Sequence, residues 1–214
     1  VTASDVMEQL GMEPGVLGLL AGCPPCQGFS TLRTRRRSQA VEDPRNDLIF
    51  EFMRFVRVLM PQVVMMENVP NLASDSRIKR VLTELEELGY HTGTDTVRVI
   101  DASDYGVPQR RRRMLLVAGR RGPLLPVKPY TKRRTVQDAI GSLPRVGKSG
   151  DPLHDVTVHR SDRILALIKS IPKNGGSRRD LPEELRLSCH MKTDGYKDVY
   201  GRLAWDDVAP TITS

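Results

Sequence analysis

Cysteine, aromatic residues and long apolar runs are scarce in this sequence, and each shortage excludes a class of protein. Three cysteines, an odd and small number, argue against a disulfide framework and favour a reducing cytosolic setting. Aromatic residues make up only 5% of the chain, so a platform that stacks single-stranded bases is poorly supported. No apolar run approaches the ~20 residues that span a bilayer, and residues 1–20 lack the basic flank and apolar core of a secretory signal.

What is present is an ordinary globular composition with an uneven charge. The 214 residues suffice for one large domain or two small ones, and a hydrophobic content of 39% excludes collagen-like and wholly disordered classes. Residues 1–100 carry 11 basic and 13 acidic side chains, whereas residues 101–214 carry 22 and 13. The basic surplus of the second half, rich in clustered arginines, is typical of a surface for a polyanion, although a solvated basic face explains it equally well.

The first 121 residues alternate between strand and helix patterns, which predicts an open α/β sheet. Short apolar runs predict strands, and apolar residues at helical spacing between caps and breakers predict helices. Only 13 residues without a helical stripe separate the last two strands, so we expect those two to form a long-looped hairpin. The expected elements are a strand at 16–21, a helix opened by Asp43-Pro44 with an apolar face of Leu48, Phe52, Phe55, Val56 and Leu59, a strand at 63–66, a helix capped by Ser74 or Asp75 and ended by Gly89, and strands at 97–100 and 114–118.

The remaining residues, 122–214, are richer in proline, glycine and basic side chains, and their strand and helix signals are weak. One helix is expected at 161–170. We interpret residues 1–121 as a catalytic α/β part and residues 122–214 as a loop-rich recognition region.

Three clusters of polar residues lie at the ends of predicted strands, and we expect these strand ends to meet at one edge of the sheet. They are residues 22–30 after the first strand, Glu67-Asn68-Val69 after the second, and Gln109 to Arg113 before the last. Open α/β sheets bind ligands at the carboxyl ends of their strands. Together the clusters offer a thiol, a carboxylate and fixed cations, a set suited to covalent attack on a polar, electron-poor ring.

The thiol that best fits this role is Cys26, which a constrained loop of Gly22, Pro24 and Pro25 would present away from the sheet. Nearby arginines would lower the pKa of such a thiol and make it a better nucleophile. Two other interpretations remain open. Cys23 and Cys26 form a Cys-x-x-Cys pair of the thiol redox kind. The same pair with Cys189 and His190 could bind zinc, although adjacent ligands suit a tetrahedral site poorly, and we predict no metal.

Taken together, these motifs resemble those of the cytosine-5 DNA methyltransferase family, in their order and spacing. The matching segments are Pro25-Cys26-Gln27 with Phe29-Ser30, Asp43 to Leu48, Glu67-Asn68-Val69, Tyr105 to Gln109 with Arg111 and Arg113, Gly175 to Pro182, and Gly201 to Thr213. The resemblance implies a Rossmann-like methyltransferase sheet with a target recognition region. It also implies a bacterial enzyme of the restriction–modification type, working in the cytoplasm on the nucleoid.

The resemblance also implies a role for each matching residue. Cys26 would add to C6 of a cytosine flipped out of double-stranded DNA, and C5 would then take a methyl group from S-adenosylmethionine. Glu67 would hold N3 and the exocyclic amine, and Arg113 would bind the O2 side with support from Arg111. The remaining assignments are contacts to substrate or DNA for Gln27, Ser30, Asn68 and Gln109, a contact to the cofactor for Leu48, and a loop closing on DNA for residues 31–45.

The chain departs from the family in its cofactor motifs. No Phe-x-Gly-x-Gly sequence precedes Leu20, so most of the S-adenosylmethionine site is missing, and the closing motifs are missing as well. We therefore expect a fragment or one half of a split enzyme, inactive alone and completed by another chain. The alternatives are a tRNA cytosine-5 methyltransferase, which the same residues allow, and the thiol redox module. No membrane partner is expected.

Overall fold

A computed structural model describes residues 2–25, 47–191 and 199–211. The chain forms two compact units. Their division differs from the single boundary after residue 121 that the sequence suggested. The first unit comprises residues 1–101 and 112–128, and the second comprises 102–111 and 129–214. The loop between the last two strands therefore belongs with the second unit.

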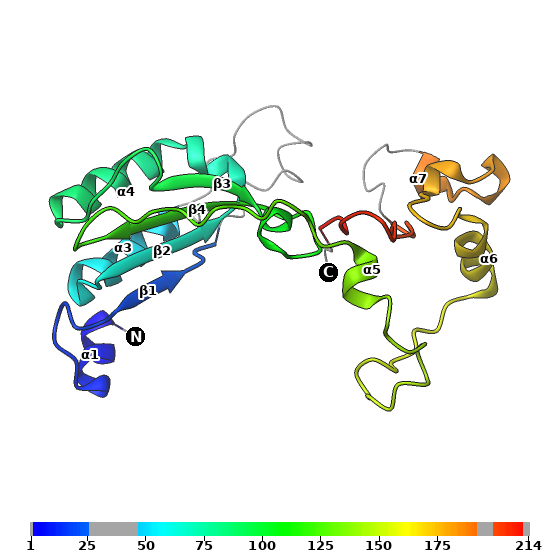
Figure 1. The fold of residues 1–214 in the computed structure, drawn as a ribbon, viewed down its shortest axis with the longest axis horizontal. Helices are drawn as coiled ribbons and strands as arrows, with labels where there is room; N and C mark the ends of the chain where they lie inside the picture. The colour runs from blue at the N-terminus through cyan, green and yellow to red at the C-terminus, as the bar shows by residue number, and fades with distance from the viewer. Residues whose placement is uncertain (1, 26–46, 192–198, 212–214) are drawn as a thin grey trace. The chain divides into compact units, whose positions relative to one another are not determined.

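A four-stranded mixed sheet organises the first unit (Figure 1). Its order is β1 (Leu19–Gly22), β2 (Val63–Asn68), β4 (Arg112–Gly119) and β3 (Val97–Asp101). Strand β1 pairs parallel to β2, whereas β4 is antiparallel to both β2 and β3. The α/β class and the hairpin of the last two strands are thus confirmed. The first strand begins three residues later than predicted, and Val16 is exposed.

Helices α3 (Leu48–Leu59) and α4 (Ser76–Glu87) share one hydrophobic core with one face of this sheet. Side chains alternate along β2, so that Val64 and Met66 are fully buried in that core while their neighbours are half-buried. A third helix, α1 (Ala3–Leu10), packs against α3.

The sequence predicted the core face of α4 correctly and that of α3 only in part. The buried residues of α4 are Ile78, Val81 and Leu85, as the pattern indicated. In α3 the buried residues are Ile49, Met53, Val56 and Leu59, so the prediction is confirmed for Val56 and Leu59, and Phe52 is half-buried against the same core. It missed Ile49 and Met53, and Leu48 and Phe55 are only half-buried, because the apolar residues of α3 cover more of its surface than the core buries.

Local signals fix where these helices begin and end. Asp75 caps α4, because its carboxylate accepts a hydrogen bond from the Arg77 backbone N–H at 2.9 Å. Helix α3 ends at Met60, which has the left-handed φ of 45°, just before Pro61. The expected helix opening at Asp43-Pro44 lies outside the described residues.

The second unit consists mainly of loops and short helices. Its longest helix, α6 (Asp162–Ser170), matches the expected one and packs in a small core of Leu167, Ile171 and Leu181. The other described elements are 3-10 helices η4 (Ala102–Tyr105), η5 (Arg178–Asp180) and η6 (Glu183–Leu185), and helices α5 (Val136–Ile140) and α7 (Ser188–Met191). A further 3-10 helix, η3 (Pro70–Ser74), belongs to the first unit.

Gly22, at the end of β1, leaves room for the ring of Phe52 on α3. A Cβ atom at Gly22 would lie 2.6 Å from two ring carbons of Phe52, which is closer than real Cβ contacts. Glycine is therefore required here for close packing of strand and helix, immediately before the Cys23–Cys26 segment.

We expect Gly22→Ala to lower the free energy of unfolding by about 1–3 kcal/mol, the usual cost of overpacking. The control is Gly18→Ala, where no atom lies within 4 Å of the added Cβ, and where the change should stay within about 0.5 kcal/mol. Urea unfolding measures both, and Phe52→Leu should restore part of the loss in the Gly22→Ala background. Equal stability of the two alanine variants would contradict this account.

Candidate active site

An ion pair between Glu67 and Arg113 lies at the edge of the sheet where β2 ends and β4 begins. The Nε atom of Arg113 lies 2.7 Å from Oε1 of Glu67, and the two side chains are 23% and 32% exposed. The strand register explains the contact: Glu67 lies opposite Leu115, and Arg113 precedes Leu115 by two residues on β4, so it lies on the same face. Arg113 also donates from a terminal nitrogen to the Arg112 carbonyl at 2.8 Å.

The neighbouring residue, Asn68, ties the end of β2 to the loop that follows β1. Its side-chain nitrogen donates to the Pro24 carbonyl at 3.0 Å, and its Oδ1 accepts from the Val69 backbone N–H at 2.9 Å. Asn68 is only 2% exposed. In this structure its side chain holds the backbone two residues before Cys26, and the predicted contact of Asn68 with DNA stays a prediction.

Cys23 lies next to Glu67 at the same edge. Gly22 pairs with Met66, and one further step in this parallel register brings Cys23 beside Glu67. Burial, and then the charge of the Glu67 carboxylate, raise the pKa of the Cys23 thiol. Attacking thiols of redox sites have lowered pKa values instead, so this environment speaks against Cys23 as a redox nucleophile.

Three residues of the third cluster, Gln109, Arg110 and Arg111, belong to the second unit, where residues 209–211 hold the first two in place. Gln109 forms a parallel β-bridge with Ala209, and the Arg110 backbone N–H donates to the Ala209 carbonyl at 2.7 Å. The Thr211 hydroxyl donates to the Arg110 carbonyl at 2.7 Å. Arg111 is exposed, and its carbonyl accepts a hydrogen bond from the Ala102 backbone N–H at 3.0 Å. The strand Arg112–Gly119 thus starts from an anchored stretch of chain.

Three predicted site residues, Cys26, Gln27 and Ser30, lie outside the described residues, as does the predicted loop 31–45. The lowered pKa expected for Cys26 is likewise untested. Leu48 is described: it is half-buried and opens helix α3. The structure therefore brings together Glu67, Arg113 and the start of the Cys26 segment.

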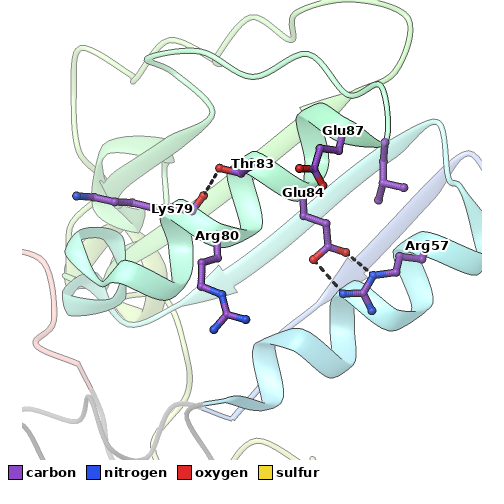
Figure 2. Close-up of a pocket in the computed structure, with 7 residues that line it drawn as sticks. Arg57, Lys79, Arg80, Thr83, Glu84 and Glu87 are labelled. Carbon is purple, nitrogen blue, oxygen red and sulfur yellow. Dashed lines mark hydrogen bonds and ion pairs between the residues drawn. The ribbon is translucent and has the colours of Figure 1, made fainter.

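A pocket on the solvent side of α3 and α4 contains none of the predicted site residues (Figure 2). The Arg57–Glu84 ion pair spans its floor between the two helices, with a second contact of 3.0 Å from a terminal nitrogen of Arg57 to Oε2. The candidate site is therefore considered at the edge of the sheet, where Glu67, Arg113 and Pro24 lie.

Among the residues that the structure describes, no group of three histidine, cysteine or acidic side chains is arranged to hold a metal ion. No helix in the described part of the chain has the length and apolar character to cross a membrane.

Sequence reasoning missed two features of this site. The tether from Asn68 to Pro24 joins residues 44 positions apart, and the bracing of Gln109 by Ala209 joins residues a hundred apart. The only sequence signal for the Asn68–Pro24 hydrogen bond is that Asn68 follows a glutamate at a strand end. No local pattern indicates the bridge between Gln109 and Ala209.

Comparison with known proteins finds relatives along almost the whole chain. A family model described as C-5 cytosine-specific DNA methylase matches residues 11–213. The Type II methylase M.HgiDII of Herpetosiphon aurantiacus is 37% identical over 92% of this chain and 56% of its own length. The Type II methyltransferase M1.HgaI of Avibacterium volantium is 35% identical over 91% of this chain and 57% of its own length. The chain thus spans little more than half the length of these relatives.

Two solved structures share the fold. A prophage-encoded DNA modification methyltransferase from E. coli matches 99% of this chain and 66% of its own, with a TM-score of 0.55 and 18% identity. The Entamoeba histolytica methyltransferase EhMeth matches 82% of this chain and 50% of its own, with a TM-score of 0.52 and 17% identity. At these identities the likeness concerns the fold, which is the Rossmann-like methyltransferase sheet.

Replacing Asn68 by alanine should lower the free energy of unfolding by about 1–3 kcal/mol, since it removes two hydrogen bonds from a buried position. Ser74→Ala is the matched control, because Ser74 is exposed and makes one 3.2 Å hydrogen bond to the Asn71 carbonyl; we expect a change within about 0.5 kcal/mol. Urea denaturation gives both values. If Asn68→Ala proved as stable as the parent chain, the tether would have no energetic role.

The raised pKa of Cys23 predicts slow alkylation, because at any given pH less of the reactive thiolate is present. Glu67→Gln removes the carboxylate charge but leaves the burial, so the rate profile of Cys23 should move part of the way toward lower pH. Iodoacetamide labelling over a pH series, read by peptide mass spectrometry, separates Cys23 from Cys26 and from Cys189, which is exposed as Cys23 is. An unchanged profile in Glu67→Gln would remove Glu67 as a cause.

Proposed function

We propose that this chain, which belongs to the C-5 cytosine-specific DNA methylase family, carries the catalytic residues and the DNA-reading region of a DNA cytosine-5 methyltransferase. The observation that carries the proposal is the 2.7 Å pair of Glu67 and Arg113 beside the root of the Cys26 segment. Residues 1–121 would do the chemistry, and residues 122–214 would read the DNA.

The Glu67–Arg113 pair suits the edge of a cytosine ring. Carboxylate oxygens accept hydrogen bonds, and guanidinium nitrogens donate them. A cytosine presents an amine donor at N4 and an acceptor at O2, with N3 between them. Glu67 would bind the amine and N3, which gains a proton as the ring is attacked, and Arg113 would stabilise the negative charge that develops at O2. Both are half-buried, which strengthens such contacts relative to water.

Cys26 would form the covalent bond. Its thiolate would add to C6 while N3 takes up a proton, the electron pair of the C5–C6 double bond would become available at C5, and C5 would bond to the methyl group as the bond from that methyl to the donor's sulfonium sulfur breaks, its electron pair staying on the sulfur. A base then takes the C5 proton, the double bond reforms and the thiolate leaves. The Asn68 tether supports this role, because it fixes the backbone at Pro24. A stacked base cannot be reached from its face, so the cytosine must be flipped out of double-stranded DNA.

S-adenosylmethionine, when bound, would supply an electrophilic methyl group on a sulfonium. The residues of this chain fit that donor only in part: Leu48 offers an apolar side chain at the start of α3, whereas the sequence contains no Phe-x-Gly-x-Gly loop before Leu20. We therefore propose that residues outside this sequence, on the same polypeptide or on a complementing chain, complete the donor site.

The second half would bind DNA chiefly through its charge. With 22 basic and 13 acidic side chains in residues 101–214, its contacts to phosphates would position the protein and make binding weaken as salt rises. Gln27, Ser30, Gln109 and Arg111 would contact the flipped strand. An enzyme with this substrate would work in the bacterial cytoplasm, on the nucleoid.

The decisive test uses duplex DNA that contains 5-fluorocytosine, with the enzyme in its complete, donor-binding form. Fluorine at C5 cannot leave as a proton does, so the protein should stay covalently attached through Cys26, and Cys26→Ser should abolish the attachment. Glu67→Gln should slow trapping by about 10²–10⁴-fold, and Arg113→Met by about 10²–10³-fold.

Trapping that persists in Cys26→Ser would overturn the assignment of the nucleophile. A tRNA substrate forms the second arm, and trapping on tRNA but not on duplex DNA would overturn the assignment of the substrate. Cys23→Ala serves as the control for redox chemistry, since methylation should survive it.

A further inference from the structure

Two ion pairs connect α3 to α4, and they lie at opposite ends of these helices. One joins Arg57, in the last turn of α3, to Glu84. The other joins Arg77, in the first turn of α4, to Asp47, the residue that precedes α3; Nε of Arg77 donates to Oδ1 of Asp47 at 2.7 Å. Only the second pair lies beside Leu48, the predicted cofactor contact.

Asp47 occupies the N-cap position of α3 but does not cap the helix. Aspartate is among the best N-cap residues, because its carboxylate accepts hydrogen bonds from the first free backbone N–H groups. At Asp47 no side-chain cap bond forms, and the backbone is already helical, with φ −83° and ψ −4°. The carboxylate contacts Arg77 instead.

Arg77 likewise occupies a position that the local preferences of helices disfavour for a cation. The first turn of a helix is the positive end of its dipole, which favours acidic side chains and disfavours arginine. The first turn of α4 contains Arg77 and no acidic residue, and Asp75 at the cap contacts the same guanidinium at 3.3 Å. Arg57, by contrast, lies in the last turn of α3, where a cation is favourable.

Stability does not account for two such exceptions. Asp47 is 60% exposed and Arg77 24% exposed, and ion pairs of this kind contribute about 0–1 kcal/mol. Local preferences that are broken without a gain in stability are expected at functional positions. The pair joins the end of segment 26–46 to α4, and the Asn68–Pro24 bond holds the other end of that segment.

We propose that Arg77 is a positioning residue, which grips Asp47 and thereby fixes the first turn of α3 and Leu48 for the methyl donor. This inference rests on the proposed function. It predicts that the Arg77–Asp47 pair matters for donor binding and for local order, whereas the Arg57–Glu84 pair on the same two helices does not.

The test compares Arg77→Met with Arg57→Met in the complete enzyme. Calorimetric titration with S-adenosylhomocysteine should give a dissociation constant raised about 2- to 30-fold in Arg77→Met, the range for residues that act through a neighbour, and unchanged in Arg57→Met. Asp47→Asn should resemble Arg77→Met, and Arg77→Lys should recover part of the affinity, because lysine keeps the charge but not the planar fork.

Hydrogen exchange provides a readout that needs no donor. The amides of Phe52 and Met53 bond to carbonyls in the first turn of α3, so they should exchange faster in Arg77→Met than in the parent protein or in Arg57→Met. Equal effects of the two substitutions, in titration and in exchange, would overturn the inference. A parent enzyme that binds no donor would overturn the proposed function, while the exchange comparison would still decide the role of Arg77.

Discussion

The contact between Glu67 and Arg113 depends on the antiparallel pairing of β2 with β4, and the rest of the site is arranged around it. In a purely parallel sheet, the start of one strand lies at the opposite edge from the end of its neighbour. Reversal of β4 brings its first residues to the edge where β1 and β2 end. A carboxylate, a guanidinium and the root of the Cys26 segment therefore meet without any long loop reaching across the sheet.

Packing beneath the sheet keeps that edge in place. The alternation along β2 buries Val64 and Met66 against α3 and α4 and leaves Glu67 half-buried on the other side. A slip of one residue in the register would bury the glutamate and expose the core, at a cost of several kcal/mol. The hydrophobic core thus enforces the position of the charged pair, and Gly22 and Asn68 hold the backbone from the end of β1 to Pro24.

Where local rules fail in this chain, a tertiary contact accounts for the failure. Asp47 does not cap its helix, and Arg77 lies at the wrong end of a helix dipole, because the two side chains bond to each other. The prediction for α3 missed Ile49 and Met53 for a related reason: nine of its twelve residues are apolar, so the neighbouring strands decide which of them are fully buried.

The sequence alone determined the kinds of elements, because the hairpin and the buried stripe of α4 follow from short-range spacing. It also placed a carboxylate and arginines beside predicted strands, from which the chemistry is proposed. It did not determine which side chains touch. Glu67 and Arg113 are 46 residues apart, and their contact depends on the register of two strands. Gln109 and Ala209 are a hundred residues apart, and their contact requires a distant part of the chain to fold back beside Gln109. Such long-range pairings leave no local period in the sequence, because they are set by the burial of the whole core.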